Sequence, residues 1–282
     1  MPSIKIIRRR MNSVATTTKI MKAMNMVAAS KLQKDKARLE AARPFLREAR
    51  GMILRLRGPS IDNNYFLRRA VKRSAYLVIT GDRGLCGSYN INLAQAALAH
   101  MDDQGKSEAI VAIGLKGYDY LKRQGKNILR RFDGVLEAAF YEDAQRIAAY
   151  LATLYESNQI DEVYVAYTRY KSALVHEPQI ERLLPLRPGE DAPGQTDDMR
   201  YDAGLSHFLD HAVPVYLSAS IYAALLESSA CEQAARMVSM DTAVNNAYEI
   251  TEDLTRIYNR RRQSSITQEI SELIASTNIL EE

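Results

Sequence analysis

Glycine and proline are absent from two long stretches at the ends of the chain, and this absence limits the possible folds more than any other feature. Residues 3–43 contain neither residue, and neither occurs in the 68 residues from Val215 to Glu282. Helices over these stretches would be about 60 Å and about 100 Å long at about 1.5 Å per residue. Globular helices usually span about 8–20 residues. We therefore expect two rods, the first interrupted at Pro44 and the second beginning after Pro214.

Each stretch carries a narrow apolar stripe. In the N-terminal stretch the spacings alternate between three and four, the pattern of a coiled-coil seam. Its six positions are Ile4, Ile7, Met11, Val14, Thr18 and Met21. The C-terminal stripe starts at Leu217, drifts through Val244, Ala247, Leu254 and Ile257, and ends on Ile266, Ile270, Leu273 and Ile274. Paired antiparallel, the two helices can bury these stripes, but the remaining residues are too few to cover the longer rod. Its far end must stand free or enter another protein.

The middle of the chain alternates between strand and helix patterns. Strands are predicted at 75–80, 108–114 and 161–170, and helices at 90–101, 115–125 and 143–157. Such alternation is typical of a parallel α/β layer. A further strand within 172–186 is expected to be antiparallel, and 187–204 reads as an acidic loop. The predicted organisation is an N-terminal coiled-coil helix over 1–58, a central α/β domain over 70–200 and a C-terminal coiled-coil helix over 205–282.

Charge is distributed unevenly along the chain. Residues 1–73 hold 19 basic and 4 acidic residues, whereas residues 74–282 hold 19 basic and 30 acidic residues. A basic segment of this kind indicates an anionic partner. Residues 1–44 contain no Phe, Tyr or Trp, so they offer no platform for stacking bases. A basic rod facing an acidic protein socket fits these facts better than a nucleic-acid contact does.

The sequence contains no convincing catalytic constellation. The segment Gly81–Gly87 follows a strand and precedes a helix, the usual place for a phosphate, but its G-x-x-G-x-x-G spacing matches no phosphate-binding fingerprint. A tight turn is the favoured interpretation. His207 and His211 have the i, i+4 spacing of a metal pair, yet a surface pair at a helix start is favoured. Cys86 is expected to be a packed residue rather than a reactive thiol. No metal or cofactor is therefore predicted.

Other classes of protein are disfavoured by composition. No run of about 18 apolar residues suggests a membrane-spanning helix, and the first residues lack the apolar core of a secretory signal. Two cysteines cannot form a disulfide framework, which favours a reducing compartment.

Several strings together resemble one family, the gamma subunit of F-type ATP synthases. They occur in order over nearly the whole chain: KIMKAMNMVAASKLQK (19–34), IDNNYF (61–66), YLVITGDRGLCGSYN (76–90), ERLLPL (181–186), ESSACEQAARMVSMDTAVNNA (227–247) and YNRRRQSSITQEISELI (258–274). The resemblance implies an α/β fold with a long antiparallel coiled coil and a central Rossmann-like domain that is not a nucleotide enzyme.

The resemblance also implies a role and partners. The gamma subunit is a central rotor stalk that turns inside a ring of alpha and beta subunits, with the epsilon subunit and the membrane c-ring at its foot. Proton-driven rotation then forces the beta catalytic sites through successive conformations, so that catalysis belongs to beta. A bacterial protein, peripheral on the cytoplasmic face of the plasma membrane, is expected. The resemblance implies neither a bound cofactor nor a nucleic-acid partner.

By position, the resemblance assigns stator contacts to eight residues. Arg262, Gln263 and Thr267 match positions that contact a catch loop of the beta subunit. Arg236 matches a coupling position of the C-terminal helix. Met24 matches a position beside the helix-turn-helix lever of beta. The other three are lysines of the basic segment around Met24, here called the collar: Lys19, Lys22 and Lys31. Arg261, Tyr248 and the tail at 278–282 depart from the family pattern.

Two other function classes stay open on the sequence alone. A basic coiled-coil nucleic-acid-binding protein with an α/β domain would recover DNA or RNA in a pull-down at moderate salt, without alpha or beta subunits. A nucleotide-dependent enzyme would require the isolated chain to bind nucleotide measurably, which we do not expect.

Overall fold

The computed structural model describes residues 3–54, 63–67, 69–187 and 205–280. The chain forms two compact units: unit 1 comprises Met1–Val27 with Met237–Glu282, and unit 2 comprises Ala28–Arg236. Two long helices, α1 (Ile4–Leu54) and α6 (Leu205–Leu280), contribute to both units. The sequence-based boundaries stay a prediction. The first two residues of the IDNNYF string, the acidic loop after residue 187 and the last two residues lie outside the described part.

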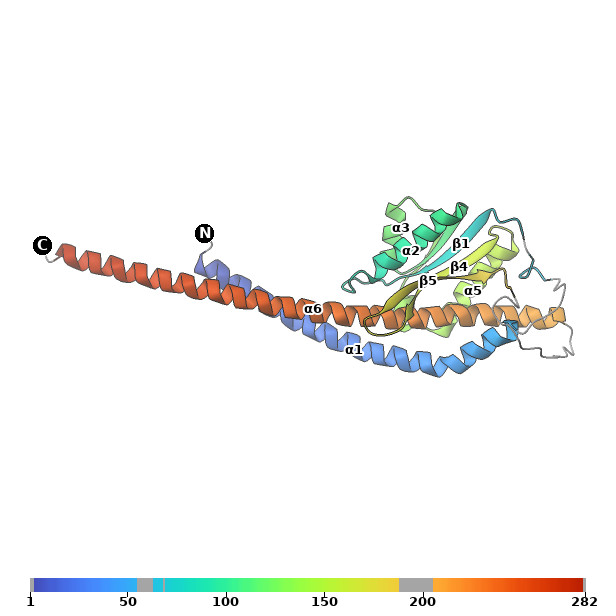
Figure 1. The fold of residues 1–282 in the computed structure, drawn as a ribbon, viewed down its shortest axis with the longest axis horizontal. Coiled ribbons are helices and arrows are strands. Elements are labelled where there is room, and N and C mark those ends of the chain that lie inside the picture. Colours follow the sequence, from blue (N-terminus) through green and yellow to red (C-terminus); the bar gives the residue numbers. More distant parts are fainter. Residues whose placement is uncertain (1–2, 55–62, 68, 188–204, 281–282) are drawn as a thin grey trace. The chain divides into compact units, whose positions relative to one another are not determined.

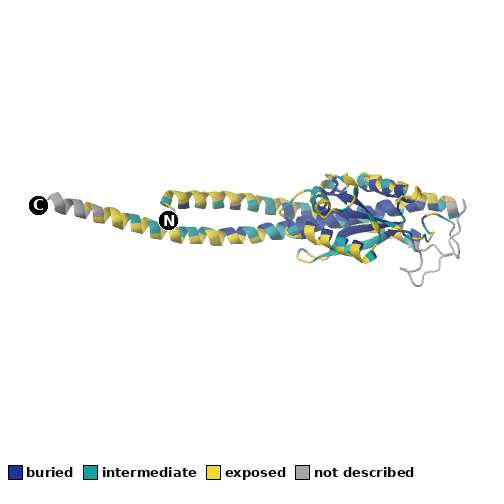
Figure 2. Ribbon diagram, turned by 90° about the horizontal axis from the view of Figure 1, so that it is seen from above, coloured by how far each residue is buried: buried dark blue, intermediate teal, exposed yellow. Residues whose placement is uncertain are grey.

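In unit 1 the first part of α1 lies beside the part of α6 that follows Met237 (Figures 1 and 2). The predicted seam of α1 is confirmed, because all six of its positions are buried or half-buried and every residue between them is exposed. The Asn25 side-chain amide donates to the Met237 carbonyl at 2.9 Å, and the Lys22 ammonium lies 5.0 Å from the centre of the Tyr248 ring. The later residue of α1, Asn25, thus contacts the earlier residue of α6, Met237, and the order is reversed for Lys22 and Tyr248. The two helices are therefore antiparallel.

The C-terminal stripe of α6 is only partly a seam. Val244 and Ala247 are buried, but Ile257 is exposed, so its assignment to the seam was wrong. Exposed too are Ile266, Ile270 and Leu273, at the end of the helix. Figures 1 and 2 show α6 continuing past the start of α1, so no described part of the chain covers this end.

Both prolines that were expected to bound the rods lie inside helices. The first helix passes through Pro44 to Leu54, and the second begins at Leu205, before Pro214. The expected interruption at Pro44 and the expected start after Pro214 are therefore wrong. A proline removes one helical hydrogen bond and crowds the carbonyl four residues earlier. Here Pro44 and Pro214 are exposed, so the freed carbonyls can be solvated while packing on the opposite face holds the helix.

Unit 2 contains a five-stranded sheet in the order β3-β2-β1-β4-β5. Its strands are β1 (Arg73–Ile79), β2 (Ser107–Ile113), β3 (Ile128–Phe132), β4 (Glu162–Tyr170) and β5 (His176–Leu184). The first four are parallel, and β5 pairs antiparallel with β4. The predicted parallel layer and its antiparallel addition are thus confirmed, whereas β3 was missed.

Alternate residues of the central strands face two separate cores. Leu77 and Ile79 belong to a core shared with α1, α6 and α5 (Tyr141–Glu156), while Tyr76 and Val78 face α2 (Tyr89–Gln104) and α3 (Leu115–Arg123). A short α4 (Val135–Ala138) follows β3. Figure 2 shows that buried residues concentrate in the sheet. The result is a sheet covered by helices on both faces, which explains its nearly continuous apolar strands.

The first part of α6 is unusually apolar. An 18-residue window in it has a mean hydropathy of 1.3, enough to meet a length-and-composition test for a membrane span. This corrects the expectation that the chain contains no such stretch. Of that window 56% is buried inside the protein, so packing against the sheet accounts for its composition.

Candidate functional site

The glycine-rich segment after β1 is a hydrogen-bonded junction at the carboxyl end of the sheet. The Asp82 carboxylate accepts hydrogen bonds from the backbone N–H groups of Leu115 and Gly134, each at 3.0 Å. The Gly81 N–H donates to the Asn90 side chain at 2.8 Å. The one acidic group of this loop therefore ties β1 to the segments after β2 and β3, as the favoured tight-turn interpretation requires.

A buried ion pair occupies the space above this loop. A Cβ atom on Gly81 would lie 2.7 Å from the Glu232 carboxylate, which forms a close ion pair with Arg236 one turn later in α6. The Arg236 guanidinium also donates to the Gln233 side chain at 3.1 Å and to the Gly84 carbonyl at 3.4 Å. Burial raises the pKa of Glu232, and Arg236 opposes that shift. The pair fastens α6 to the loop.

A second buried acid joins the two long helices within unit 2. Asp35 of α1 is buried and accepts a hydrogen bond of 2.8 Å from the Ser229 hydroxyl of α6. Burial raises the pKa of Asp35, while Ser229, Arg38 and Lys31 lower it. Lys31 is half-buried and also acts electrostatically on Glu232. The positive charge of Lys31 thus stabilises the charged forms of two buried carboxylates, in addition to the partner contact that the resemblance implies for the collar.

Asp35 should make the stability of unit 2 depend on pH. Its pKa in the folded chain lies above the unfolded value of 3.8, so its stabilising contribution is complete below that value and is lost as pH rises through the folded pKa. We expect Asp35→Asn to lose less stability than the wild type between pH 4 and pH 7, since asparagine keeps a partner for Ser229 without a buried charge. Urea unfolding at both pH values measures this.

The matched control for this prediction is Asp253→Asn. Asp253 is exposed and pairs with Arg256 on the surface of α6, so its replacement should leave the pH slope unchanged. Equal slopes for wild type and Asp35→Asn would contradict the assignment.

The two cysteines are packed inside unit 2, as the sequence favoured for Cys86. Cys86 is 1% exposed and Cys231 is 0% exposed, and both contact Tyr89 in one small cluster. Burial raises the pKa of each thiol. Because the thiolate is the reactive form, this environment is unsuited to a nucleophile.

The histidine pair lies on the surface near the start of α6. His207 and His211 are both exposed, with ring centres 4.9 Å apart in an edge-to-face arrangement. Among the described residues no group of three or more potential ligands is placed to hold a metal ion. The surface-pair interpretation is confirmed.

The predicted contact residues fall into three different environments. Lys19 and Lys22 are exposed and Met24 is half-buried on α1. At the far end of α6 three predicted residues are exposed: Arg262, Gln263 and Thr267. Arg236, by contrast, is only 8% exposed and is held by its own chain. The structure therefore leaves the side chains of the first two groups wholly or partly accessible, whereas Arg236 makes its contacts inside unit 2.

Sequence reasoning missed the internal acids. Neither Asp35 nor Glu232 was singled out, although each has a visible signal. Asp35 is an isolated acid in a strongly basic segment, and Glu232 lies four residues before Arg236 on the same helix face. That spacing also occurs on solvated helices, so only burial distinguishes these residues.

Comparison with known proteins identifies one family. The family model described as "ATP synthase" matches residues 3–280. A protein of Alkaliphilus metalliredigens named ATP synthase gamma chain is 36% identical, over 97% of each chain. One with the same name from Heliobacterium modesticaldum is 38% identical, over 99% of this chain and all of that protein.

Solved structures agree on the fold. The central stalk of the Tetrahymena thermophila mitochondrial ATP synthase is 26% identical, with a TM-score of 0.63, covering 79% of this chain and 99% of that one. The rotor of the Euglena gracilis mitochondrial ATP synthase has a TM-score of 0.69 over 93% of this chain and 98% of that one. At 19% identity, this second likeness supports the fold alone.

Proposed function

Since this chain belongs to the family of ATP synthase gamma chains, and is thus a non-catalytic subunit of that complex, we propose that it couples rotation of a membrane c-ring to conformational change at beta-subunit sites. The observation that supports this coupling role is the uncovered end of α6. Ile266, Ile270 and Leu273 are exposed there, and apolar residues in a row call for a partner. The nucleic-acid-binding alternative has no support from the comparisons.

The proposed partners are those of a central stalk. Alpha and beta subunits would surround the far end of α6 and the start of α1, while the epsilon subunit and the c-ring would bind at the foot. The similar solved structures are a central stalk with a c-ring and a rotor. The complex is membrane-associated. We place this chain on the cytoplasmic face of a bacterial plasma membrane, peripheral through its partners.

Rotation requires contacts that form and break in turn. An exposed ion pair contributes about 0–1 kcal/mol, so no single contact of Arg262, Lys19 or Lys22 would lock the shaft at one angle. The shaft would bind some conformations of the neighbouring subunits more tightly than others. This difference in affinity shifts the populations of those conformations. Exposed polar residues beside exposed apolar ones on α6 suit this use better than one continuous apolar face.

The contact residues can be tested by replacing Arg262 and Gln263 together with alanine. Both side chains are exposed, so the isolated chain should fold normally. Losing one or two contacts of about 0–1 kcal/mol each should lower the ATPase turnover of the assembled complex by about two- to tenfold. Steady-state ATPase assays on reconstituted complex measure the effect.

The chain offers a matched control for this experiment. Arg123 and Gln124 form the same dipeptide, exposed at the end of α3 in unit 2, and their double replacement by alanine should leave turnover unchanged. Unchanged turnover and coupling in the Arg262/Gln263 variant would refute the assignment of these residues to the stator contact.

A further inference from the structure

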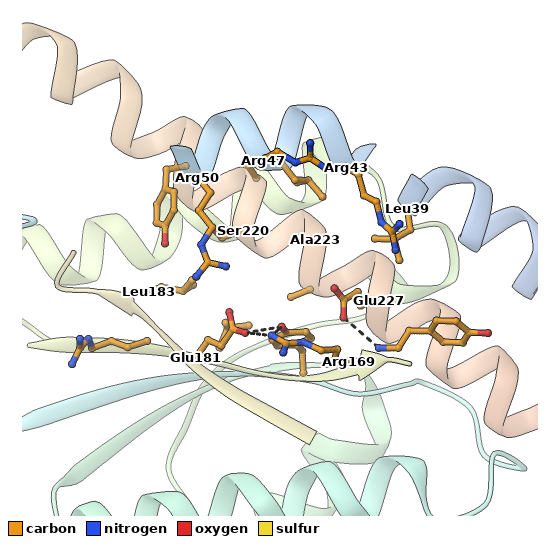
Figure 3. Close-up of a pocket in the computed structure, with 18 residues that line it drawn as sticks. Leu39, Arg43, Arg47, Arg50, Arg169, Glu181, Leu183, Ser220, Ala223 and Glu227 are labelled. Carbon is orange, nitrogen blue, oxygen red and sulfur yellow. Dashed lines mark hydrogen bonds and ion pairs between the residues drawn. The ribbon is translucent and has the colours of Figure 1, made fainter. Parts of the chain in front are cut away.

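A groove in unit 2 runs between α1, the strands β4 and β5, and α6. Its volume is about 630 Å³. Five arginines and two glutamates line it: Arg43, Arg47, Arg50, Arg169, Arg182, Glu181 and Glu227. In Figure 3, Arg43 and Arg50 extend from α1 toward the strands, and Arg169 and Glu181 lie on the opposite wall. The lining therefore carries more positive than negative charge.

The α1 wall carries its positive charges on one helix face. Arg43, Arg47 and Arg50 have the spacing i, i+4, i+7, which places them in a row about 10 Å long. All three side chains are exposed. Like charges at i, i+4 destabilise a helix by about 0.2–0.5 kcal/mol per pair, so the row works against the helix that bears it. A negatively charged occupant would relieve this repulsion.

The acids of the groove have partners of their own. Glu181 pairs with Arg169 at 2.6 Å and accepts a hydrogen bond from the Tyr167 hydroxyl at 2.9 Å. Glu227 accepts a hydrogen bond of 3.3 Å from the Tyr170 N–H, and burial raises its pKa. These contacts hold both carboxylates against the strands β4 and β5, and Arg43 acts on Glu227 as a nearby charge. The positive row is therefore available to a ligand.

The shape of the groove distinguishes between classes of anion. A compact phosphate is typically held by convergent backbone N–H groups, whereas this groove presents charges in a line with Glu181 and Glu227 on the facing walls. Its floor on α6 has small residues, Ala219, Ser220 and Ala223, which permit the close approach of another helix. A ligand with carboxylates in a line would match the arginine row, and an apolar group on the same ligand would match the small residues of α6.

We propose that this groove docks an acidic amphipathic helix of another protein, whose carboxylates at i, i+4 and i+7 pair with Arg43, Arg47 and Arg50. Such a helix would lie along α1 and place an apolar side chain over the small residues of α6. The proposal goes beyond the rotor function and does not depend on it, because the binding belongs to the isolated chain.

Fluorescence anisotropy on the full chain tests this with two labelled 18-residue peptides of equal composition. One is a helix with glutamates at i, i+4 and i+7, and the other has the same residues in scrambled order. We expect the ordered peptide to bind more tightly. We expect Arg43→Gln/Arg47→Gln/Arg50→Gln to weaken its binding about tenfold or more, because three charged pairs of up to about 1 kcal/mol each are lost.

The matched control removes the same charge elsewhere. Arg8→Gln/Arg9→Gln/Arg10→Gln replaces three exposed arginines of unit 1 and should change binding less than twofold. Equal binding of the two peptides, or equal losses in the two triple variants, would overturn the proposal in favour of non-specific attraction. Displacement of the ordered peptide by inorganic tripolyphosphate at much lower concentration than by unlabelled peptide would overturn it in favour of a phosphate ligand.

Discussion

Glu232→Ala should lower the free energy of unfolding of unit 2 by about 3–5 kcal/mol, the range found when one partner of a buried ion pair is removed. Glu232 and Arg236 have side chains only 7% and 10% exposed. Without the carboxylate, the guanidinium would remain buried with only the Gln233 side chain and the Gly84 carbonyl as acceptors. Urea unfolding at pH 7, followed by hydrogen exchange in β1 and α2, measures the loss.

An exposed pair on the same helix provides the control. Asp253 and Arg256 lie 2.5 Å apart with side chains 64% and 70% exposed, and a pair of this kind contributes about 0–1 kcal/mol. Asp253→Ala should therefore have a small effect, and Glu232→Gln should recover part of the loss by keeping an acceptor. Equal effects of Glu232→Ala and Asp253→Ala would show that Arg236 is solvated rather than buried.

Gly114→Ala should destabilise unit 2 by about 2–5 kcal/mol or prevent its folding. Gly114 follows β2 with φ of +84°, and a Cβ atom there would lie 2.1 Å from the Thr80 carbonyl oxygen. Left-handed backbone costs a non-glycine residue about 1–2 kcal/mol, and overpacking adds about 1–3 kcal/mol. The contacted atom belongs to the backbone after β1, so it cannot rotate aside. Thermal unfolding and soluble yield measure the effect.

Gly125→Ala separates backbone strain from the clash. Gly125 also has positive φ, +72°, but a Cβ atom there would meet nothing within 4 Å. It should cost only about 1–2 kcal/mol. If both alanine variants were equally stable, the close approach of the β1 and β2 ends would not exist in solution.

The seam of α1 and the strands of unit 2 were predictable because their signals are local and periodic. A residue buried against a neighbouring helix recurs every three or four positions, and this pattern located all six seam positions of α1. Strands such as 108–114 and 161–170 were visible as short apolar, β-branched runs. The edge strand β3 was missed because its ILRRF sequence carries two exposed arginines.

Failures of sequence reasoning occurred where distant segments decide the outcome. Pro44 and Pro214 break helices by local rules, yet packing of the opposite face carries both helices through them. The apolar residues near Ile266 resemble a seam in the sequence, but α1 begins opposite an earlier part of α6, and this end stays exposed.

The sequence by itself determined the two rods, the parallel layer between them, and the family, because each is written in residue spacing or in distinctive strings. Only the tertiary structure decided the environment of each charge. Arg236 and Arg262 are both arginines on α6, but one is buried against Glu232 and the other is exposed. Likewise Asp35 is internal, whereas Arg43, Arg47 and Arg50 form an open row. The reason is physical: the cost of a charge depends on the solvent and partners that folding leaves around it.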